Sequence, residues 1–237
     1  MDIAQAGVAF HVSARTGNAV RMLSSLYDGA EIDFSSGIPT AFDTRRPSDL
    51  MVQRFGEICF IFNDSLASTL LQGADPARVH RALGAPQILL AFKQDEAAGR
   101  FGYALFERGE HRRTRLQTSA QSGSPYVTAR GAPLPFERRW LAASHYMDTG
   151  ENGRAAPARI YYLGEREILV PEKRLTGRML EDGLEALFGV CPCETLMTPS
   201  YRFCRVKSLP TGGGSVDLDD TALPVPHRPA RPWWKPR

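Results

Sequence analysis

The chain has 237 residues, of which 43% are hydrophobic and 23% charged, and its formal net charge at pH 7 is +3. This length is enough for one large domain or two small ones with a substantial buried core. Four basic residues lie in the last eleven positions, and without them 25 basic residues face 26 acidic ones. The composition therefore shows no basic patch of the kind that strong non-specific binding to nucleic acid requires.

Cysteine usage and the first residues bear on the compartment. Only four cysteines occur, Cys59, Cys191, Cys193 and Cys204. The chain begins Met-Asp-Ile-Ala-Gln, without the basic and then apolar segments of a secretory signal. No apolar run approaches the roughly 20 residues that a membrane-spanning helix needs. We therefore expect a cytoplasmic protein without a membrane segment.

The first elements follow from hydrophobic periodicity. Alternating apolar residues predict a strand over residues 7–14, and helical spacing predicts a short helix after Gly17. Residues 33–47 lack a clean period and are expected to form a loop. This loop would lead into a helix over residues 48–55, where the Ser48 hydroxyl is suited to cap the first turn.

A second group of elements has clearer boundaries. A continuous apolar run predicts a buried strand over residues 58–62, and Asn63 and Asp64 predict the capped start of a helix over residues 65–71. The next predicted helix begins at Asp75-Pro76 and ends before Gly84.

The middle of the chain predicts an antiparallel meander. Its strands are expected over residues 87–93, 99–107 and 111–119, with Arg108-Gly109 at a tight turn. Residues 122–135 are rich in Gly, Ser and Pro and predict a long surface loop.

The last elements are a short strand over residues 158–163, a helix over residues 178–188 that ends at Gly189, and a strand over residues 201–206. Together the elements predict an α+β fold: a mixed, largely antiparallel sheet flanked by helices. A single globular domain would span residues 1–208, followed by a disordered, Pro-rich, basic tail over residues 209–237.

Three short segments resemble one bacterial family. They are Phe62-Asn-Asp64, Gly131-Ala-Pro-Leu-Pro-Phe-Glu-Arg138 and Glu185-Ala-Leu-Phe-Gly189. Their order is similar to that in the uncharacterised family called domain of unknown function 6928, over roughly residues 7–206. The resemblance implies an opening of alternating strands and helices, then a meander whose aromatic-rich strand is Phe101 to Phe106. It implies no activity.

This chain departs from that family after Trp140. The family continues from its tryptophan through alanine, glycine and glutamate to histidine, whereas Trp140-Leu-Ala-Ala-Ser-His145 is one residue longer and lacks the glutamate. A role of that glutamate therefore does not carry over to this chain.

The segment from Gly131 to His145 concentrates charge, aromatic rings and a histidine. Its residues Glu137, Arg138, Trp140 and His145 could line a ligand or partner site, with arginine for anions, tryptophan for stacking and histidine for proton transfer. The alternative is a proline-stiffened loop that Phe136 and Trp140 anchor to the core, with Glu137 paired to an arginine.

Asn63 and Asp64 are a second candidate site. They follow a probable central strand, and ligands in open α/β sheets often bind at such an end. Helix capping accounts for both residues without a ligand. Both interpretations stay open at this level.

The cysteines and the arginine-rich strand have ordinary alternatives. Cys191-Pro-Cys193 with Cys204 lacks the fourth ligand and the usual spacing of a zinc site, so we expect no metal and no cofactor. Arg112, Arg113 and Arg115 could form a basic edge for phosphate or nucleic acid, or a solvated strand edge that resists aggregation. In the tail, Trp233 and Trp234 could dock on a partner.

Familiar catalytic signatures are absent from the sequence: the Walker A loop, the dinucleotide fingerprint, the His-Glu-x-x-His pair and the Gly-x-Ser-x-Gly elbow. We therefore expect a binding or interaction protein, of immunity or accessory type, that takes another protein or a small ligand and catalyses no reaction. The first alternative is a hydrolase or transferase with His145 or Asp64 as base and Arg138 as anion clamp. The second is nucleic-acid binding through the arginine strand and the tail.

Overall fold

The computed structural model describes residues 5–12, 19–35, 37–119, 124–149, 157–164, 168–192 and 197–207. The helices are α1 (Ala19–Leu26), α2 (Asp64–Leu71), α3 (Ala77–Ala82), α4 (Pro135–Leu141) and α5 (Leu175–Phe188), with a 3-10 turn η2 (Glu172–Arg174) before α5. The predicted tail over residues 209–237, with Trp233 and Trp234, lies outside the described residues.

A large sheet forms the centre of the protein. It has nine strands in the order β2-β12-β3-β4-β1-β5-β6-β7-β8. Their bounds are β1 (Gln5–His11), β2 (Ile32–Ser35), β3 (Asp49–Phe55), β4 (Ile58–Phe62), β5 (Ile88–Asp95), β6 (Arg100–Glu107), β7 (Glu110–Thr118), β8 (Tyr126–Arg130) and β12 (Ser200–Val206). All pairings between these strands are antiparallel. The predicted α+β class, with an antiparallel sheet flanked by helices, is confirmed.

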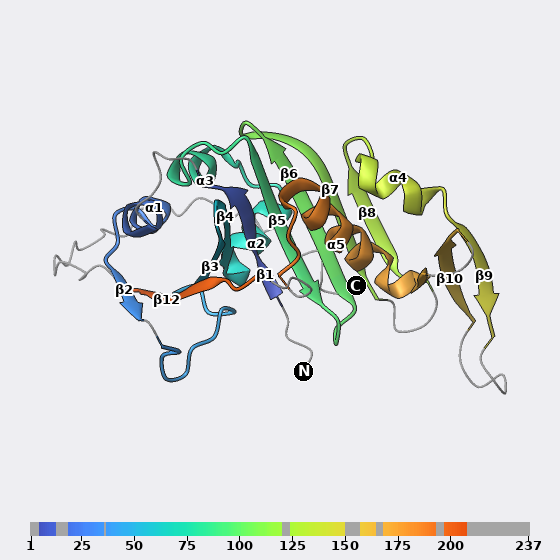
Figure 1. Ribbon diagram of the computed structural model, residues 1–237, viewed down its shortest axis with the longest axis horizontal. Helices are drawn as coiled ribbons and strands as arrows, with labels where there is room; N and C mark the ends of the chain where they lie inside the picture. Colours follow the sequence, from blue (N-terminus) through green and yellow to red (C-terminus); the bar gives the residue numbers. More distant parts are fainter. Residues whose placement is uncertain are drawn as a thin grey trace, which may run out of the picture.

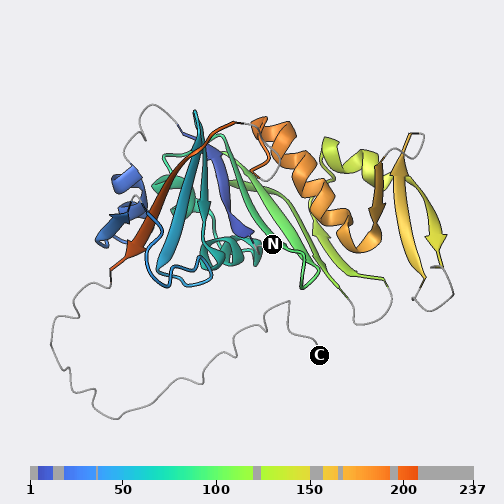
Figure 2. The same ribbon diagram turned by 60° about the horizontal axis from the view of Figure 1, so that its bottom comes forward.

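Helices cover the sheet on both faces because its strands bury alternate residues on opposite sides. Val8 and Phe10 of β1 belong to a core with α1, α2 and α3, whereas Ala9 belongs to a core with α4 and α5. Both views separate the two helix layers, with α5 crossing one face of β6 and β7 (Figures 1 and 2). The two faces of β7 therefore meet different surroundings.

A second, smaller sheet lies beyond α4. It has three strands in the order β11-β10-β9, with bounds β9 (Ser144–Asp148), β10 (Ala158–Leu163) and β11 (Ile168–Pro171). Figure 1 shows β9 and β10 at the end of the molecule next to α4. Val170 and Leu163 join this sheet to the core under α5, while all five residues of β9 are exposed.

Two glycines meet specific backbone demands. A Cβ at Gly7 would lie 2.3 Å from the carbonyl oxygen of Ile61 on the paired strand β4, so only glycine fits there. Gly189 ends α5 with φ +66°, the left-handed conformation that glycine adopts without steric cost. The predicted end of this helix is confirmed.

The predicted helix over residues 48–55 is wrong. The segment forms β3, which pairs with β4 on one side and β12 on the other. Leu50 and Val52 pack against the first helix layer and Phe55 packs in the opposite core, which is the period of a strand. Ser48 caps no helix, because none starts there; its hydroxyl lies 3.4 Å from Asp49 Oδ1.

The predicted loop over residues 122–135 is also partly wrong. Tyr126–Arg130 forms β8, the edge strand beside β7, although every one of its residues is exposed. The following segment, expected to lack regular structure, contains α4 with Pro135 at its first turn, where the missing N–H has no cost. The strands β2, β9 and β11 were not predicted at all.

The remaining predicted elements are present with small shifts in their bounds. They are β1, α1, β4, α2, α3, the meander β5 to β7, β10, α5 and β12. The turn between β6 and β7 has positive φ at both Arg108 and Gly109, as a two-residue hairpin turn requires.

Candidate functional site

Asn63 holds the start of α2 and takes no part in an open site. Its side chain is fully buried, and Oδ1 accepts a hydrogen bond from the Leu66 N–H at 2.8 Å. Its Nδ2 donates to the carbonyl oxygens of Arg46, Pro47 and Asp49 at 3.0 to 3.2 Å. These contacts support the capping interpretation, and they leave Asn63 without capacity for a ligand.

Asp64 lies next to Asn63 but faces a different environment. Its carboxylate is paired with Lys93 of β5 at 2.5 Å, and its side chain is 30% exposed. Both residues line a small hollow of about 200 Å³ that also includes Arg45, Asp95 and Arg100. Two acids and three bases line this hollow, so both signs of charge are present in it.

Glu137 and Trp140 are buried on α4 and cannot contact a ligand from solvent. Glu137 Oε1 accepts hydrogen bonds from Tyr103 Oη at 2.5 Å and from Arg113 Nε at 2.9 Å, and Oε2 lies 2.7 Å from Arg113 Nη2. Trp140 Nε1 donates to Asp182 of α5. Trp140 thus anchors α4 to the core and Glu137 pairs with an arginine, as the structural alternative expected.

Arg138 and His145 are exposed, and they lie on different elements. Arg138 Nε donates to the carbonyl oxygen of Pro133 at 3.3 Å. His145 belongs to β9, where its ring lies 5.4 Å from that of Tyr161. Glu137 and Trp140 thus lie on the same helix, α4. The structure does not bring Glu137, Asp64 and His145 into one pocket. The predicted catalytic constellation is not formed.

The arginine-rich strand β7 differs from both of its predicted interpretations. Arg113 and Arg115 are buried, with 3% and 7% of their surface exposed, under α4 and α5. Only Arg112 reaches solvent, and it pairs with Glu107 and Glu110. The strand is therefore not a basic edge open to phosphates, which removes the structural basis for nucleic-acid binding at this position.

The described residues contain no group of three or more His, Cys, Asp or Glu side chains arranged for a metal ion. Cys59, Cys191 and Cys204 are buried, and burial raises the pKa of Cys59 to about 12 and that of Cys204 to about 11. Cys193 lies outside the described residues. None of the described helices is long and apolar enough to cross a membrane.

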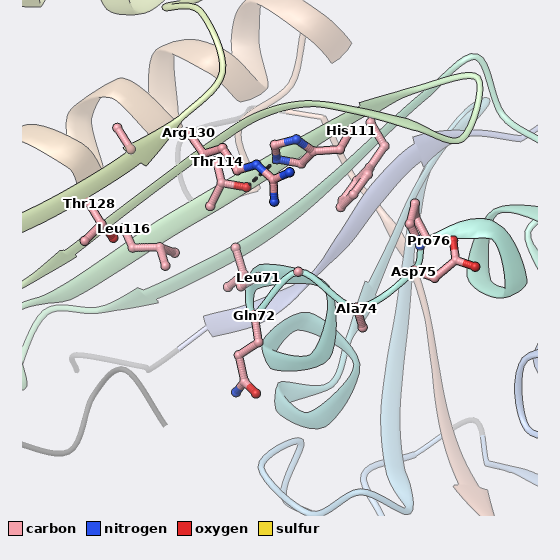
Figure 3. A pocket seen from close by; sticks show the side chains of 13 residues that line it. Leu71, Gln72, Ala74, Asp75, Pro76, His111, Thr114, Leu116, Thr128 and Arg130 are labelled. Atoms are coloured by element: carbon pink, nitrogen blue, oxygen red, sulfur yellow. Dashed lines mark hydrogen bonds between the residues drawn. The ribbon is translucent and has the colours of Figure 1, made fainter. Parts of the chain in front are cut away.

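A hollow lies on the opposite face of β7, beside the end of α2. It is a groove of about 370 Å³ between the end of α2 with its following loop and the strands β6, β7 and β8. Figure 3 shows the side chains of His111, Thr114, Leu116 and Arg130 on the strands, with Leu71 at the end of α2 across the groove.

The floor of this groove is apolar. Leu71, Phe106 and Leu116 line it, and each is at least 92% buried because it also packs in the core beneath the first helix layer. An apolar floor that stays partly open favours a ligand with a hydrocarbon body.

One side of the groove is polar. His111 Nε2 lies 2.7 Å from Thr114 Oγ1, and the Phe106 ring contacts the imidazole edge-on at 5.7 Å. Arg130 is the direct cross-strand partner of Thr114, and its guanidinium is exposed. Burial, followed by the charge of Arg130, lowers the pKa of His111, so the imidazole is neutral at pH 7.

Sequence reasoning missed this site because β8 was predicted as a loop. Thr128 and Arg130 face the groove only once Tyr126–Arg130 pairs with β7. The signal that could have found them is the run Tyr-Val-Thr-Ala-Arg, which holds three residues of high strand propensity.

Comparisons of the chain with protein-family models, with curated proteins and with solved structures give no match. The resemblance to domain of unknown function 6928 therefore stays a prediction.

Proposed function

We propose that this protein is a binding protein without catalytic activity, and that the groove between α2 and β6 to β8 takes a small amphipathic carboxylate. The observation that carries this proposal is the pairing of an apolar floor with one exposed arginine at the polar side. The carboxylate would contact Arg130, and the hydrocarbon body would lie over Leu71, Phe106 and Leu116.

The chemistry of the polar side favours an anion over a cation. Arg130 has a planar guanidinium suited to two carboxylate oxygens. His111 is neutral at pH 7, so it contributes a hydrogen bond and no charge, and Thr114 supplies a hydroxyl 2.7 Å away. Asp75, the acid that lines the groove, is occupied in part because Oδ1 accepts the Ala77 N–H of α3.

Nuclear magnetic resonance can test the proposal with hexanoate and 3-phenylpropanoate as probes, and with hexylamine and hexanol as matched compounds without a carboxylate. We expect saturable shifts of the Leu71 and Leu116 methyl signals with the two acids only. The substitution Arg130→Gln should weaken binding of the acids about tenfold, since a hydrogen bond to a charged group contributes about 1.5 kcal/mol or more.

Arg112→Gln is the matched control. Arg112 of β7 is exposed, as Arg130 of β8 is, but it pairs with Glu107 and Glu110 outside the groove. This substitution should leave binding of the acids unchanged. Equal shifts with hexylamine and hexanoate would contradict the proposal, as would acid binding that Arg130→Gln does not affect.

A second function rests on the contact between His111 and Thr114. A neutral imidazole 2.7 Å from a hydroxyl is the arrangement of a general base beside a nucleophile. Acyl transfer to Thr114 would then release an activated leaving group such as p-nitrophenol from p-nitrophenyl acetate. Hydrolysis of p-nitrophenyl acetate should be lost in both Thr114→Val and His111→Gln. Hydrolysis that is retained in either variant would reject this function.

A further inference from the structure

Arg115 is a buried cation whose charged end has no acceptor. It lies on the face of β7 beneath α5, and 7% of its surface is exposed. Its Nε donates to Thr176 Oγ1 at 3.0 Å. Nη1 and Nη2 find no hydrogen-bond or ion-pair partner in the described parts of the chain, yet neither is fully enclosed. The two terminal nitrogens thus remain available to a ligand.

The buried charges around Arg115 do not balance. Glu137 is the one buried acid next to this arginine among the described residues, and it forms an ion pair with Arg113 and accepts a hydrogen bond from Tyr103. Arg113 and Arg115 therefore contribute two positive charges against one negative charge. A buried charge without a counter-charge is costly, and burial is the main cause that lowers the pKa of Arg115. An anion next to Arg115 would remove this imbalance.

Two tyrosines from different strands lie near Arg115. Tyr103 of β6 is its direct cross-strand neighbour, and Tyr161 of β10 is close enough to affect its charge. The Tyr161 oxygen accepts a hydrogen bond from Arg159 Nη1 at 3.3 Å, which leaves the Tyr161 proton free to be donated. The Tyr103 proton is donated to Glu137, so Tyr161 is the one of the two that supplies an additional hydroxyl donor near Arg115.

The start of α5 is fixed at this position by Gln117. Its Nε2 donates to the carbonyl oxygens of Glu172 and Lys173, and its Oε1 accepts the Thr176 N–H at 3.1 Å. This clamp holds Thr176 against Arg115 and brings the positive end of the 14-residue helix dipole close to the guanidinium. The helix start therefore adds positive potential, while the nearby Glu172 carboxylate is paired with Arg159 at 3.1 Å.

We propose that the Nη1 and Nη2 edge of Arg115, with the Tyr161 hydroxyl, binds an oxyanion: the carboxylate or phosphate group of a small molecule. The planar guanidinium presents two parallel donors that match two oxygens of such a group. This site is separate from the groove, because Thr114 and Leu116 project from the opposite face of β7.

Thermal unfolding of the full chain tests the proposal, with sodium chloride, acetate or phosphate at equal ionic strength. Acetate or phosphate should raise Tm with concentration relative to chloride, since a ligand that binds only the folded state stabilises it. A response to acetate alone assigns a carboxylate ligand, and a response to phosphate alone assigns a phosphate. No response to either overturns the proposal.

Two methionine variants separate the site from a merely structural arginine. Arg115→Met removes the unbalanced charge at similar volume, so in chloride its Tm should equal or exceed that of the wild type, and the anion response should vanish. Arg113→Met leaves Glu137 without its cation and should lower Tm strongly. Arg112→Met, at the exposed arginine of the same strand, should leave the anion response intact.

Two further variants keep the test decisive if Arg115→Met does not fold. Arg115→Lys keeps the charge but loses the two parallel donors of the guanidinium. This variant should fold and respond more weakly to the anion. Tyr161→Phe should raise the Kd for acetate or phosphate about tenfold, because it removes one hydrogen bond to a charged group. An anion response that persists undiminished in Arg115→Lys and Tyr161→Phe would refute the site.

Discussion

Asn63 offers the sharpest test of how this fold is held together. An asparagine at a helix start can usually be exchanged for aspartate, because both accept an early backbone N–H. Here the amide also donates to three carbonyl oxygens at 3.0 to 3.2 Å, and the side chain is fully buried. Asn63→Asp should therefore destabilise the protein more than Asn63→Ala, although aspartate is the better cap.

The magnitudes follow from the contacts. Asn63→Ala loses the cap, about 1 kcal/mol, and the amide donor, about 1 kcal/mol for each of its two N–H groups. We expect a loss of roughly 3 kcal/mol in the free energy of unfolding. Asn63→Asp places a carboxylate oxygen against three carbonyl oxygens in a buried position, which should cost roughly 2 kcal/mol more.

Urea unfolding at pH 7 measures both changes. Asp75→Asn is the matched control, because the Asp75 side chain also accepts a backbone N–H at a helix start, that of Ala77 at 2.9 Å, but it is exposed. This exchange should change stability by less than about 0.5 kcal/mol. If Asn63→Asp is as stable as the wild type, the three carbonyl contacts contribute nothing and the argument fails.

Three further outcomes are expected. Glu137→Gln should cost about 3 to 5 kcal/mol in urea unfolding, because buried Arg113 loses its counter-charge; a change below about 1 kcal/mol would contradict this. Arg205 holds the pKa of buried Asp49 below its ordinary value, so Asp49 stabilises the fold above the unfolded pKa and loses this effect as pH falls through the folded pKa. Asp49→Asn should flatten the acid side of the stability profile, and an unchanged profile would rule the pair out as its cause. Gly7→Ala should lower the urea midpoint by the equivalent of about 1 to 3 kcal/mol, since backbone atoms of the paired strand β4 block the new Cβ. An unchanged midpoint would show that β1 and β4 can move apart without a cost in stability.

Local chemistry made part of the fold predictable. The cap at Asn63, the left-handed Gly189 and the turn at Arg108-Gly109 each depend on residues within a few positions of one another. The strands β4 to β7 were also predicted, because buried neighbours on both sides demand long apolar or alternating runs. These features need no knowledge of distant segments.

Two errors arose where local pattern does not distinguish the alternatives. The segment Asp49–Phe55 is short and mostly apolar, and such a segment fits a helix or a strand until its neighbours are known. Here β12, from the far end of the chain, and β4 make it a strand. Exposed strands such as β8 and β9 bury no face, so they carry no alternating pattern to detect.

The candidate site shows the same division. The sequence singled out Asn63 and Trp140 as candidate site residues. It could not distinguish helix capping by Asn63, or anchoring of α4 by Trp140, from contact with a ligand. It also grouped Arg112, Arg113 and Arg115 as one basic run. The structure separates them, because the period of a strand sends Arg113 and Arg115 under helices from later in the chain, while Arg112 stays in solvent.

The sequence by itself determined the α+β class, the strands β4 to β7, the start of α2, the end of α5 and the turn of the β6–β7 hairpin, because these follow from local capping, turn chemistry and periodic burial. Only the tertiary structure decided what surrounds the side chains on each face of β7. That choice depends on α5 and β8, and the hydrogen bond that joins β7 to α5 links Arg115 and Thr176, which are 61 positions apart. It makes Arg115 a buried cation on one face and opens the groove at His111 and Thr114 on the other.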